Sequence, residues 1–220
     1  METRAAATRD AILVAAERLF AERGLTLVSN RQVSEAAGQG NNAAVNYHFG
    51  TKTDLVRAIL RKHHPEVTAR RQALVAGIRG SDEPRDWIGC WVRPATDYLE
   101  SLGTPTWFAR FSAQVMAEPA YRDLVTTEAL SDPALTQVLE GLNRCSPALP
   151  IEVRLQRNYM TRLLIVDLLA ECERVLAEGG HGPWASWPVA ANGLVDALVG
   201  LWLAPVSPSP GHRDPARPTR

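Results

Sequence analysis

The 220-residue sequence lacks the short motifs that mark several large enzyme classes. It has no Gly-rich phosphate-binding loop after a strand-like segment, no His-Glu-x-x-His and no Gly-x-Ser-x-Gly. Each of these motifs brings together the groups that one kind of chemistry needs, such as backbone N–H groups for a phosphate or two imidazoles for zinc. We therefore predict that the protein is not an enzyme and that it carries no cofactor.

Cysteine is scarce as well. Cys90, Cys145 and Cys172 are widely spaced, and none belongs to a Cys-x-x-Cys pair. Such a set indicates reduced side chains in the core or on the surface, because disulfide frameworks and zinc sites need paired, closely spaced cysteines. The adjacent His63 and His64 would point to different sides of a helix, so we expect no metal site from them.

Long apolar runs are absent. No stretch of about 18 apolar residues occurs, which is the length that a membrane-spanning helix needs. The amino terminus also lacks the apolar segment of a secretory signal peptide. We expect a cytoplasmic protein with no membrane partner.

Strand-like alternation of apolar and polar residues is absent too. Apolar residues recur three and four positions apart from residue 53 onward, which predicts an all-α protein. The length suffices for a small head and a larger body with its own core. We assign residues 6–66 to the head, 67–205 to the body and 206–220 to a Pro-rich tail that we expect to be disordered. Pro65 should kink or interrupt the helix at the boundary.

The most informative segment is residues 30–55. Its pattern predicts a short helix, a turn that contains Gly38 and Gly40, a second short helix and the start of a third. Val45 and Phe49 lie four apart and would face the core from the second helix. Helix-turn-helix units of this size place their second helix in the major groove of DNA.

Three stretches of the head carry a resemblance to a known family. They are Ala-Ala-Glu-Arg-Leu-Phe-Ala-Glu-Arg-Gly (15–24), Val-Ser-Glu-Ala-Ala-Gly (33–38) and Val-Asn-Tyr-His-Phe-Gly-Thr-Lys-Thr-Asp-Leu (45–55). In this order they resemble the amino-terminal DNA-binding domain of TetR-family transcriptional regulators, over about residues 8–66. The turn at 38–42 is one residue longer than the commonest family version, so base contacts are not assigned to single residues.

The predicted DNA-binding residues combine small and polar side chains, which allow a close approach to bases and phosphates. The resemblance implies phosphate contacts for Tyr47 and His48. Lys52 would oppose the dipole of its own helix, and a phosphate would compensate for that. The full set is Asn30, Arg31, Asn41, Asn42, Ala43, Ala44, Asn46, Tyr47, His48 and Lys52.

The zero net charge hides an asymmetry along the chain. Residues 1–72 hold 11 Lys and Arg against 7 Asp and Glu, whereas residues 73–212 hold 10 against 16. A mildly basic head on an acidic body fits one DNA-binding end. The excess is small for a single head, and pairing two heads would double the phosphate contacts, so we expect a homodimer.

The last two predicted helices, 151–178 and 186–204, are candidates for the subunit contact. The second is apolar around most of its circumference and contains several small residues, which would let another helix approach closely. The resemblance implies that these helices form a four-helix dimer interface. The alternative is that both complete the core of the monomer.

Aromatic residues of the body suggest a small-molecule site. We predict ligand contacts for Trp107, Phe108, Phe111 and Tyr159, because pockets are mostly apolar with a few placed polar groups. The alternative is that these aromatics are ordinary core, which is common at helical spacing.

Together these expectations describe an all-α protein with an N-terminal three-helix helix-turn-helix DNA-binding domain and a C-terminal helical ligand-binding and dimerisation domain. By resemblance, it would be a ligand-responsive regulator, most often a repressor, that binds a palindromic double-stranded DNA operator as a dimer and is released by a small-molecule effector of unknown identity. The alternative is a helical small-molecule-binding protein with a vestigial DNA-binding head.

Overall fold

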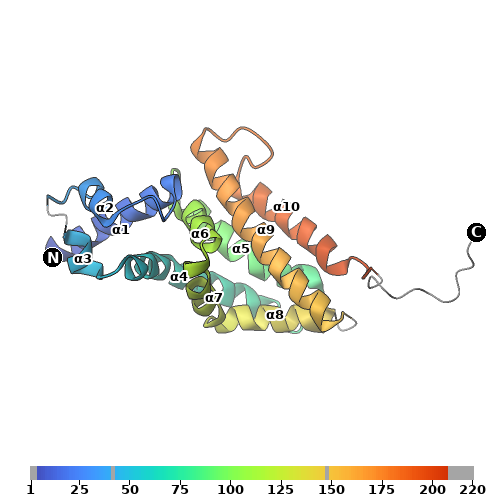
Figure 1. Ribbon diagram of the computed structural model, residues 1–220. Coiled ribbons are helices and arrows are strands. Elements are labelled where there is room, and N and C mark those ends of the chain that lie inside the picture. The colour runs from blue at the N-terminus through green and yellow to red at the C-terminus, as the bar shows by residue number, and fades with distance from the viewer. Residues whose placement is uncertain (1–3, 41–42, 147–148, 208–220) are drawn as a thin grey trace, which may run out of the picture.

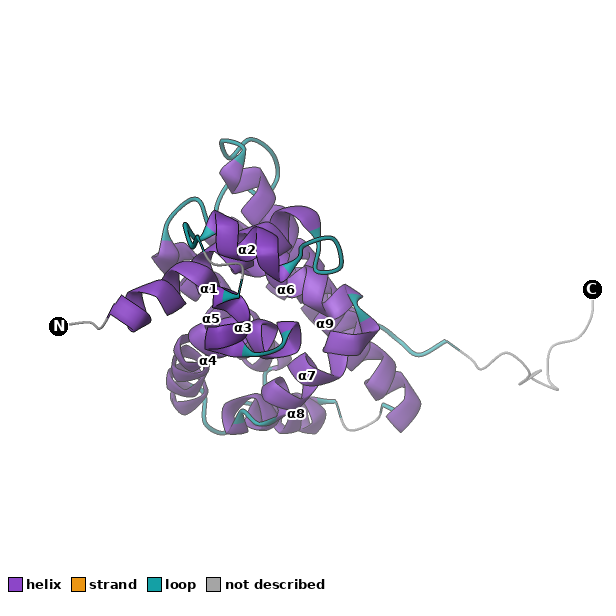
Figure 2. Cartoon of the chain, turned by 60° about the vertical axis from the view of Figure 1, so that its left-hand side comes forward, coloured by secondary structure: helices purple, strands orange, loops and turns teal. Residues whose placement is uncertain are grey.

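The computed structural model describes residues 4–40, 43–146 and 149–207. Within these ranges the chain forms helices and loops without a strand, which confirms the predicted all-α class (Figures 1 and 2). None of the helices in this part of the chain is long and apolar enough to cross a membrane. The helices are α1 (Arg4–Arg23), α2 (Asn30–Ala36), α3 (Ala44–Phe49), α4 (Lys52–Gly77), α5 (Pro84–Leu102), α6 (Phe108–Ala117), α7 (Pro119–Leu130), α8 (Pro133–Cys145), α9 (Ile151–Ala177) and α10 (Trp187–Leu203).

The head consists of α1, α2, α3 and the first turns of α4, at the left of Figure 1. Capping boxes start two of its helices: Ser29 and Gln32 satisfy each other's backbone N–H groups at α2, and Thr51 and Asp54 do so at α4. The apolar side chains that these helices bury form one cluster, which includes Ile12, Leu19, Phe20, Val33, Val45, Leu55 and Ile59. Ala36, which the spacing places on the same face as Val33, is exposed.

The head and the body share this cluster. Phe111 and Val115 of α6 are fully buried in it, and the Phe111 ring lies 6.2 Å from the Phe20 ring of α1. The start of α6 is fixed from the other side, because the buried carboxylate of Glu173 on α9 accepts hydrogen bonds from the backbone N–H groups of Ala109 and Arg110 at 3.1 and 2.9 Å. A carboxylate stabilises a helix at this end, where N–H groups have no partner within the helix.

A single helix joins head and body. α4 runs from Lys52 to Gly77 with Pro65 inside it, so an interruption at Pro65 is wrong. Proline removes one backbone donor and crowds the preceding turn, but it does not end a helix whose neighbouring turns are held by packing. Leu60 and Val67 are buried on either side of Pro65 and supply that packing. The proposed boundary at residue 66 therefore lies in the middle of a continuous helix.

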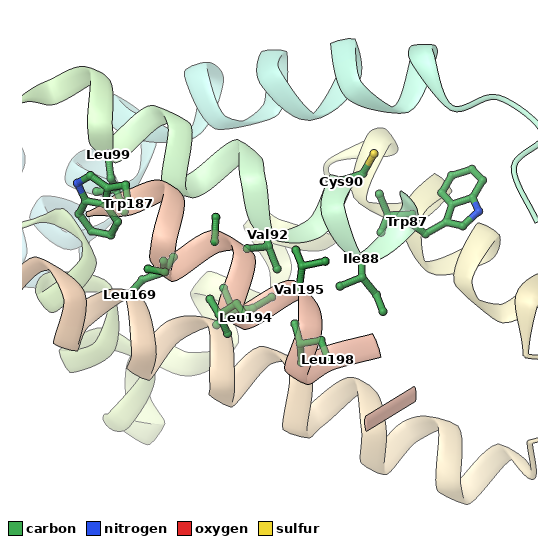
Figure 3. Packing of buried hydrophobic residues seen from close by; sticks show 14 of the residues in the cluster. Trp87, Ile88, Cys90, Val92, Leu99, Leu169, Trp187, Leu194, Val195 and Leu198 are labelled. Atoms are coloured by element: carbon green, nitrogen blue, oxygen red, sulfur yellow. The ribbon is translucent and has the colours of Figure 1, made fainter. Parts of the chain in front are cut away.

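The core of the body lies between α5 and α10 (Figure 3). Leu99 and Trp187 meet at one end of this contact, and Ile88 and Leu198 at the other, so the two helices run antiparallel. Leu198 is fully buried in this core. α9 packs beside α10, and Figure 1 shows the two helices along the side of the body away from the head.

The turn residues Asn41 and Asn42 and residues 208–220 of the tail lie outside the described residues. The two predicted helices 151–178 and 186–204 correspond to α9 and α10, whose ends differ from the prediction by no more than one residue.

Candidate DNA-binding surface and body cavity

The outer face of α3 presents polar and aromatic side chains to solvent. Val45 is fully buried and anchors the helix in the core of the head. Asn46 and Tyr47 are exposed, and the Tyr47 side chain retains 84% of its accessible surface, beside the His48 ring at 5.1 Å. An aromatic side chain with this exposure contributes little to the monomer's core, and its hydroxyl is available to a phosphate.

The beginning of α2 lies against α3. The amide of Asn30 donates a hydrogen bond of 2.8 Å to the side-chain oxygen of Asn46, so two of the predicted residues are already paired with each other. Arg31 forms a 2.8 Å ion pair with Glu35 one turn along its own helix. α3 begins after Ala43, which has no side-chain oxygen to cap it. Asn41 and Asn42, two of the predicted DNA-binding residues, lie outside the described residues.

Lys52 has surroundings that its position in the sequence does not indicate. Its ammonium group donates hydrogen bonds to the carbonyl oxygens of Leu25 and Val28, the latter at 2.6 Å, and lies 5.5 Å from the centre of the Phe20 ring. Partial burial lowers the pKa of Lys52, although the charge of Glu118 acts in the opposite direction. An ammonium has three N–H donors, so one remains for a phosphate. Lys52 thus ties the start of α4 to the loop between α1 and α2.

A cavity of about 210 Å³, the inner cavity, lies in the body between α4, α5, α6 and α9. Its walls are mainly apolar and include Leu60, Val67, Leu99, Phe108, Met116, Ile165 and Leu169, with His64, Tyr98 and Ser112 as the polar exceptions. An outer hollow of about 450 Å³ lies beside it, lined among others by Arg71, Trp91, Asn158, Tyr159 and Arg162. Both are bordered by Met116, Val125, Ile165 and Val166, so they are adjacent.

The structure separates the four predicted ligand residues. Phe108 lines the inner cavity and Tyr159 the outer hollow. Phe111 is part of the core between head and body, and Trp107 borders a different hollow beside α1 and α2. The directions of the Phe108 and Phe111 side chains depend on how α6 is rotated against its neighbours, which the sequence spacing does not specify. The sequence spacing also did not indicate that Leu60 and His64 of α4 line the inner cavity.

A buried hydrogen-bonded chain connects the wall of the inner cavity to the head. His63 on α4 is 2% exposed, and its Nδ1 lies 2.7 Å from the Tyr98 hydroxyl while its Nε2 lies 2.9 Å from the Glu17 carboxylate on α1. Burial alone would raise the pKa of Glu17, but the hydrogen bond and charge of His63, with Lys62 nearby, lower it overall. The ionised carboxylate can only accept, so Nε2–H of His63 donates to Glu17.

The same imidazole packs on an aromatic residue of the cavity wall. The rings of His63 and Phe108 are stacked with centroids 3.9 Å apart, and the ring of Phe111 follows at 6.4 Å from Phe108. Tyr98 and Phe108 line the inner cavity, and both contact His63. His63 therefore bridges two residues of the cavity wall and Glu17 on the first helix of the head.

The three cysteines are unpaired. Burial raises the pKa of the thiols of Cys90 and Cys172 to about 11, so both are protonated near neutral pH. Among the described residues, no group of three or more His, Cys, Asp and Glu side chains converges on a point where a metal ion could bind.

The geometry of the head defines a class of protein. A short helix, a tight turn and a second short helix with an exposed face, held against a longer first helix, form a helix-turn-helix unit of the kind found in DNA-binding regulators. Residues 12–59 match the family model described as bacterial regulatory proteins, tetR family. The match covers the head, which is therefore a helix-turn-helix domain of the TetR type.

Over most of its length, the fold of the chain is similar to that of two solved structures. The crystal structure of NalD, the secondary repressor of the MexAB-OprM multidrug efflux pump in Pseudomonas aeruginosa, aligns with a TM-score of 0.53 at 20% identity, over 87% of this chain and 93% of that chain. A second structure, of native NalD, aligns with a TM-score of 0.51 at 22% identity, over 87% and 94%. These similarities establish the shared fold. No curated protein matches the chain.

Proposed function

We propose that this protein is a dimeric, ligand-responsive repressor that binds a palindromic DNA operator through α2 and α3 and acts in the cytoplasm, where its target DNA lies. The observation that carries the proposal is the outer face of α3, where Asn46 and Tyr47 are exposed on a helix anchored by buried Val45. Tyr47, His48 and the third N–H of Lys52 would hold phosphates.

The proposed subunit contact is an exposed apolar face on α9 and α10. Met160, Leu163 and Leu164 of α9 keep 44%, 38% and 42% of their accessible surface, and a shallow groove beside them is bordered by Trp184. Gly200 of α10 has no atom within 4 Å of where a Cβ would lie, so a second helix could approach it. Contiguous exposed apolar surface of this kind is typical of protein interfaces.

The proposed response to an effector depends on the contacts between cavity and head. Two heads can bind one palindrome only if their α3 helices lie about one turn of DNA apart, roughly 34–36 Å, or a multiple of that distance. A ligand changes this spacing only if it binds two arrangements of the heads with different affinity. Tyr98 and Phe108 border the inner cavity and contact His63, which holds Glu17 of α1, so movement of this wall would reach the head directly.

The alternative is a small-molecule-binding protein with a head that no longer binds DNA. Selection of genomic fragments that bind the purified protein, followed by affinity measurements at several salt concentrations, separates the two. We expect enrichment of fragments with a palindrome, and an affinity that falls steeply with salt because phosphate contacts release counterions. Failure to enrich any sequence, with a well-folded protein, would favour the alternative.

A further inference from the structure

The outer hollow is bordered by two arginines, Arg71 and Arg162, whereas the described lining of the inner cavity contains no Lys, Arg, Asp or Glu. We propose that the effector is a small amphipathic monoanion, with an apolar chain in the inner cavity and a carboxylate-like head held in the outer hollow by Arg71, Asn158 and Arg162. This inference rests on the proposed ligand-responsive function and gives that site a chemical class of ligand.

The inner cavity favours an apolar guest. Of its three polar lining residues, Tyr98 uses its hydroxyl on His63, and Ser112 donates to the carbonyl oxygen of Phe108 at 2.8 Å. His64 is the third. Two of the three are thus already bonded within the protein, and a polar group placed here would lose hydrogen bonds to water without replacing them.

The outer hollow contains buried polar atoms without partners. Arg71 is 7% exposed, and its Nε–H has no acceptor, while the side-chain oxygen of Asn158 has no donor. Unsatisfied buried groups are rare in folded proteins, because each costs the hydrogen bond that it had with water. A ligand oxygen would satisfy Arg71, and half a turn of the Asn158 amide would present its N–H groups to the same oxygen or its neighbour.

The charge of the outer hollow is positive. Its charged lining residues, within the part of the chain that the structure describes, are Arg71 and Arg162. The Arg71 guanidinium is paired with the buried Asp132, which also caps α8. Arg162 lies 4.7 Å over the Tyr159 ring, and its charge leaves the lining with one net positive charge. Since opposite charges attract most strongly where water is scarce, an anion should bind here in preference to a cation.

The sizes of the two spaces set the length of the ligand. At about 30 Å³ per small group, which is the share of one molecule in liquid water, the 210 Å³ inner cavity holds roughly seven methylene groups. The four residues that border both spaces place the head and the chain of such a ligand next to each other. Octanoate is therefore a suitable probe.

The test compares probes that share one chain and differ in their head group. Titration calorimetry and melting temperature would be measured with octanoate, octanol and octylammonium. We expect octanoate to raise the melting temperature and to bind at least tenfold more tightly than octanol, and octylammonium to bind least. Arg162→Met should remove the preference for octanoate over octanol. Arg174→Met, at an exposed arginine on the same helix that pairs with Glu171 and Glu178, should retain it.

Filling the inner cavity tests the location. Ala95→Phe should abolish binding of octanoate and octanol alike. If this variant has a lower melting temperature than the unmodified protein without ligand, Ser112→Leu is the second variant that fills the cavity. Equal affinities for octanoate and octanol, or unchanged binding in the filled variants, would overturn the proposal. Failure of all three probes while selected DNA fragments still bind would refute the ligand class and leave the DNA-binding function standing. Octanoate binding with the predicted preference but no release of DNA would support the ligand class and contradict its role as effector.

Discussion

Tyr47 and Lys52 lie five positions apart in the motif that resembles the TetR family, and their side chains have different surroundings. Tyr47 is almost fully exposed on α3. Lys52 directs its ammonium group at two carbonyl oxygens of the loop between α1 and α2. A substitution at Tyr47 should therefore act on DNA binding alone, whereas one at Lys52 should also act on the stability of the head.

We expect Tyr47→Ala to weaken binding to every duplex by a similar factor. A hydrogen bond to a charged group contributes about 1.5–3 kcal/mol, which corresponds to roughly 10- to 150-fold in affinity. Because a phosphate contact does not read sequence, the ratio between operator and unrelated DNA should stay the same. Fluorescence anisotropy with both duplexes measures this, and an unchanged operator affinity would remove Tyr47 from the proposed site.

Lys52→Met provides the comparison. It leaves the carbonyl groups of Leu25 and Val28 without their donor, so we expect a lower melting temperature in addition to weaker DNA binding, with about 1–3 kcal/mol lost if both carbonyls stay buried. Tyr47→Ala should leave the melting temperature unchanged. Equal melting temperatures for Lys52→Met and the unmodified protein would show that the two carbonyl contacts do not stabilise the head.

Glu17 should make the junction between head and body sensitive to acid. The His63 and Lys62 contacts outweigh burial and hold its pKa below the ordinary value of 4.5. Since the unfolded chain then binds more protons in this range, the contribution of Glu17 is complete above about pH 4.5 and is lost as the pH falls through the lower, folded-state value. The melting temperatures of the unmodified protein and Glu17→Gln should differ at pH 7 and converge as the pH drops below 4.5.

The matched control is Glu22→Gln, at an exposed position of the same helix. The difference in melting temperature between Glu22→Gln and the unmodified protein should stay nearly constant over the same pH range. A Glu17→Gln variant that runs parallel to the unmodified protein between pH 7 and pH 3 would contradict the role assigned to the buried carboxylate.

At the scale of elements, the position of α8 depends on one close approach. Gly141 lies against the ring of Trp87 on α5, and a Cβ atom added there would come within 2.2 Å of the ring. The indole cannot move away easily, because it is buried and its N–H donates to the carbonyl oxygen of Ser81 at 2.9 Å. This contact determines how α8 packs against α5. α8 also borders the outer hollow through Leu135 and Leu139.

Gly141→Ala should therefore destabilise the protein by about 1–3 kcal/mol, the usual cost of overpacking. Urea unfolding measures the change. Gly89→Ala on α5 is the control, because its nearest atom would be the Nε of Arg93 at 3.9 Å. Alanine is the better helix former, so this variant should be neutral or up to about 1 kcal/mol more stable. Similar stabilities for the two variants would show that α8 can shift without cost.

At the scale of the whole molecule, the proposed regulation needs three surfaces on one chain: one for DNA, one for a ligand and one for a second subunit. The exposed face of α3, the inner cavity and the exposed apolar face of α9 and α10 lie at different places on the chain, as Figure 1 shows for the helices that carry them. α4 connects the first two without interruption, and the core between α1 and α6 holds the head against the body. A change at the cavity wall can thus reach α1 through packed side chains.

The proposed dimer predicts that Leu164→Asp yields a folded monomer. Leu164 is 42% exposed in the single chain, so a charge there does not disturb the monomer but would be buried without a partner in the subunit contact. Light scattering should give about twice the chain mass of 24.1 kDa for the unmodified protein and about that of one chain for the variant. Operator binding should fall together with the mass.

Leu102→Asp on α5 is the control, since Leu102 has the similar exposure of 43% outside the proposed contact. It should remain dimeric. Leu198 is unsuitable for this test although its helix belongs to the proposed contact, because it lies in the monomer's own core and a charge there would unfold the chain. A single-chain mass for the unmodified protein at micromolar concentration would count against the dimer.

The sequence by itself determined the helical class, the order of the helices and the position of the DNA-binding unit. These depend on local signals: the spacing of Val45 and Phe49, the caps at Ser29 and Thr51, and the breaks around Gly103 and Pro133. Local signals act over one or two helical turns, which is the distance over which sequence spacing maps directly onto a face.

Only the tertiary structure decided which side chains meet across helices. The rotation of α6 placed Phe108 at the inner cavity and Phe111 in the shared core, and packing on both sides kept α4 helical through Pro65. The contact of His63 with both Glu17 and Tyr98 joins residues 46 and 35 positions apart. Such contacts are set by the packing of whole helices against one another, because many side chains together fix the angle and the rotation of each helix.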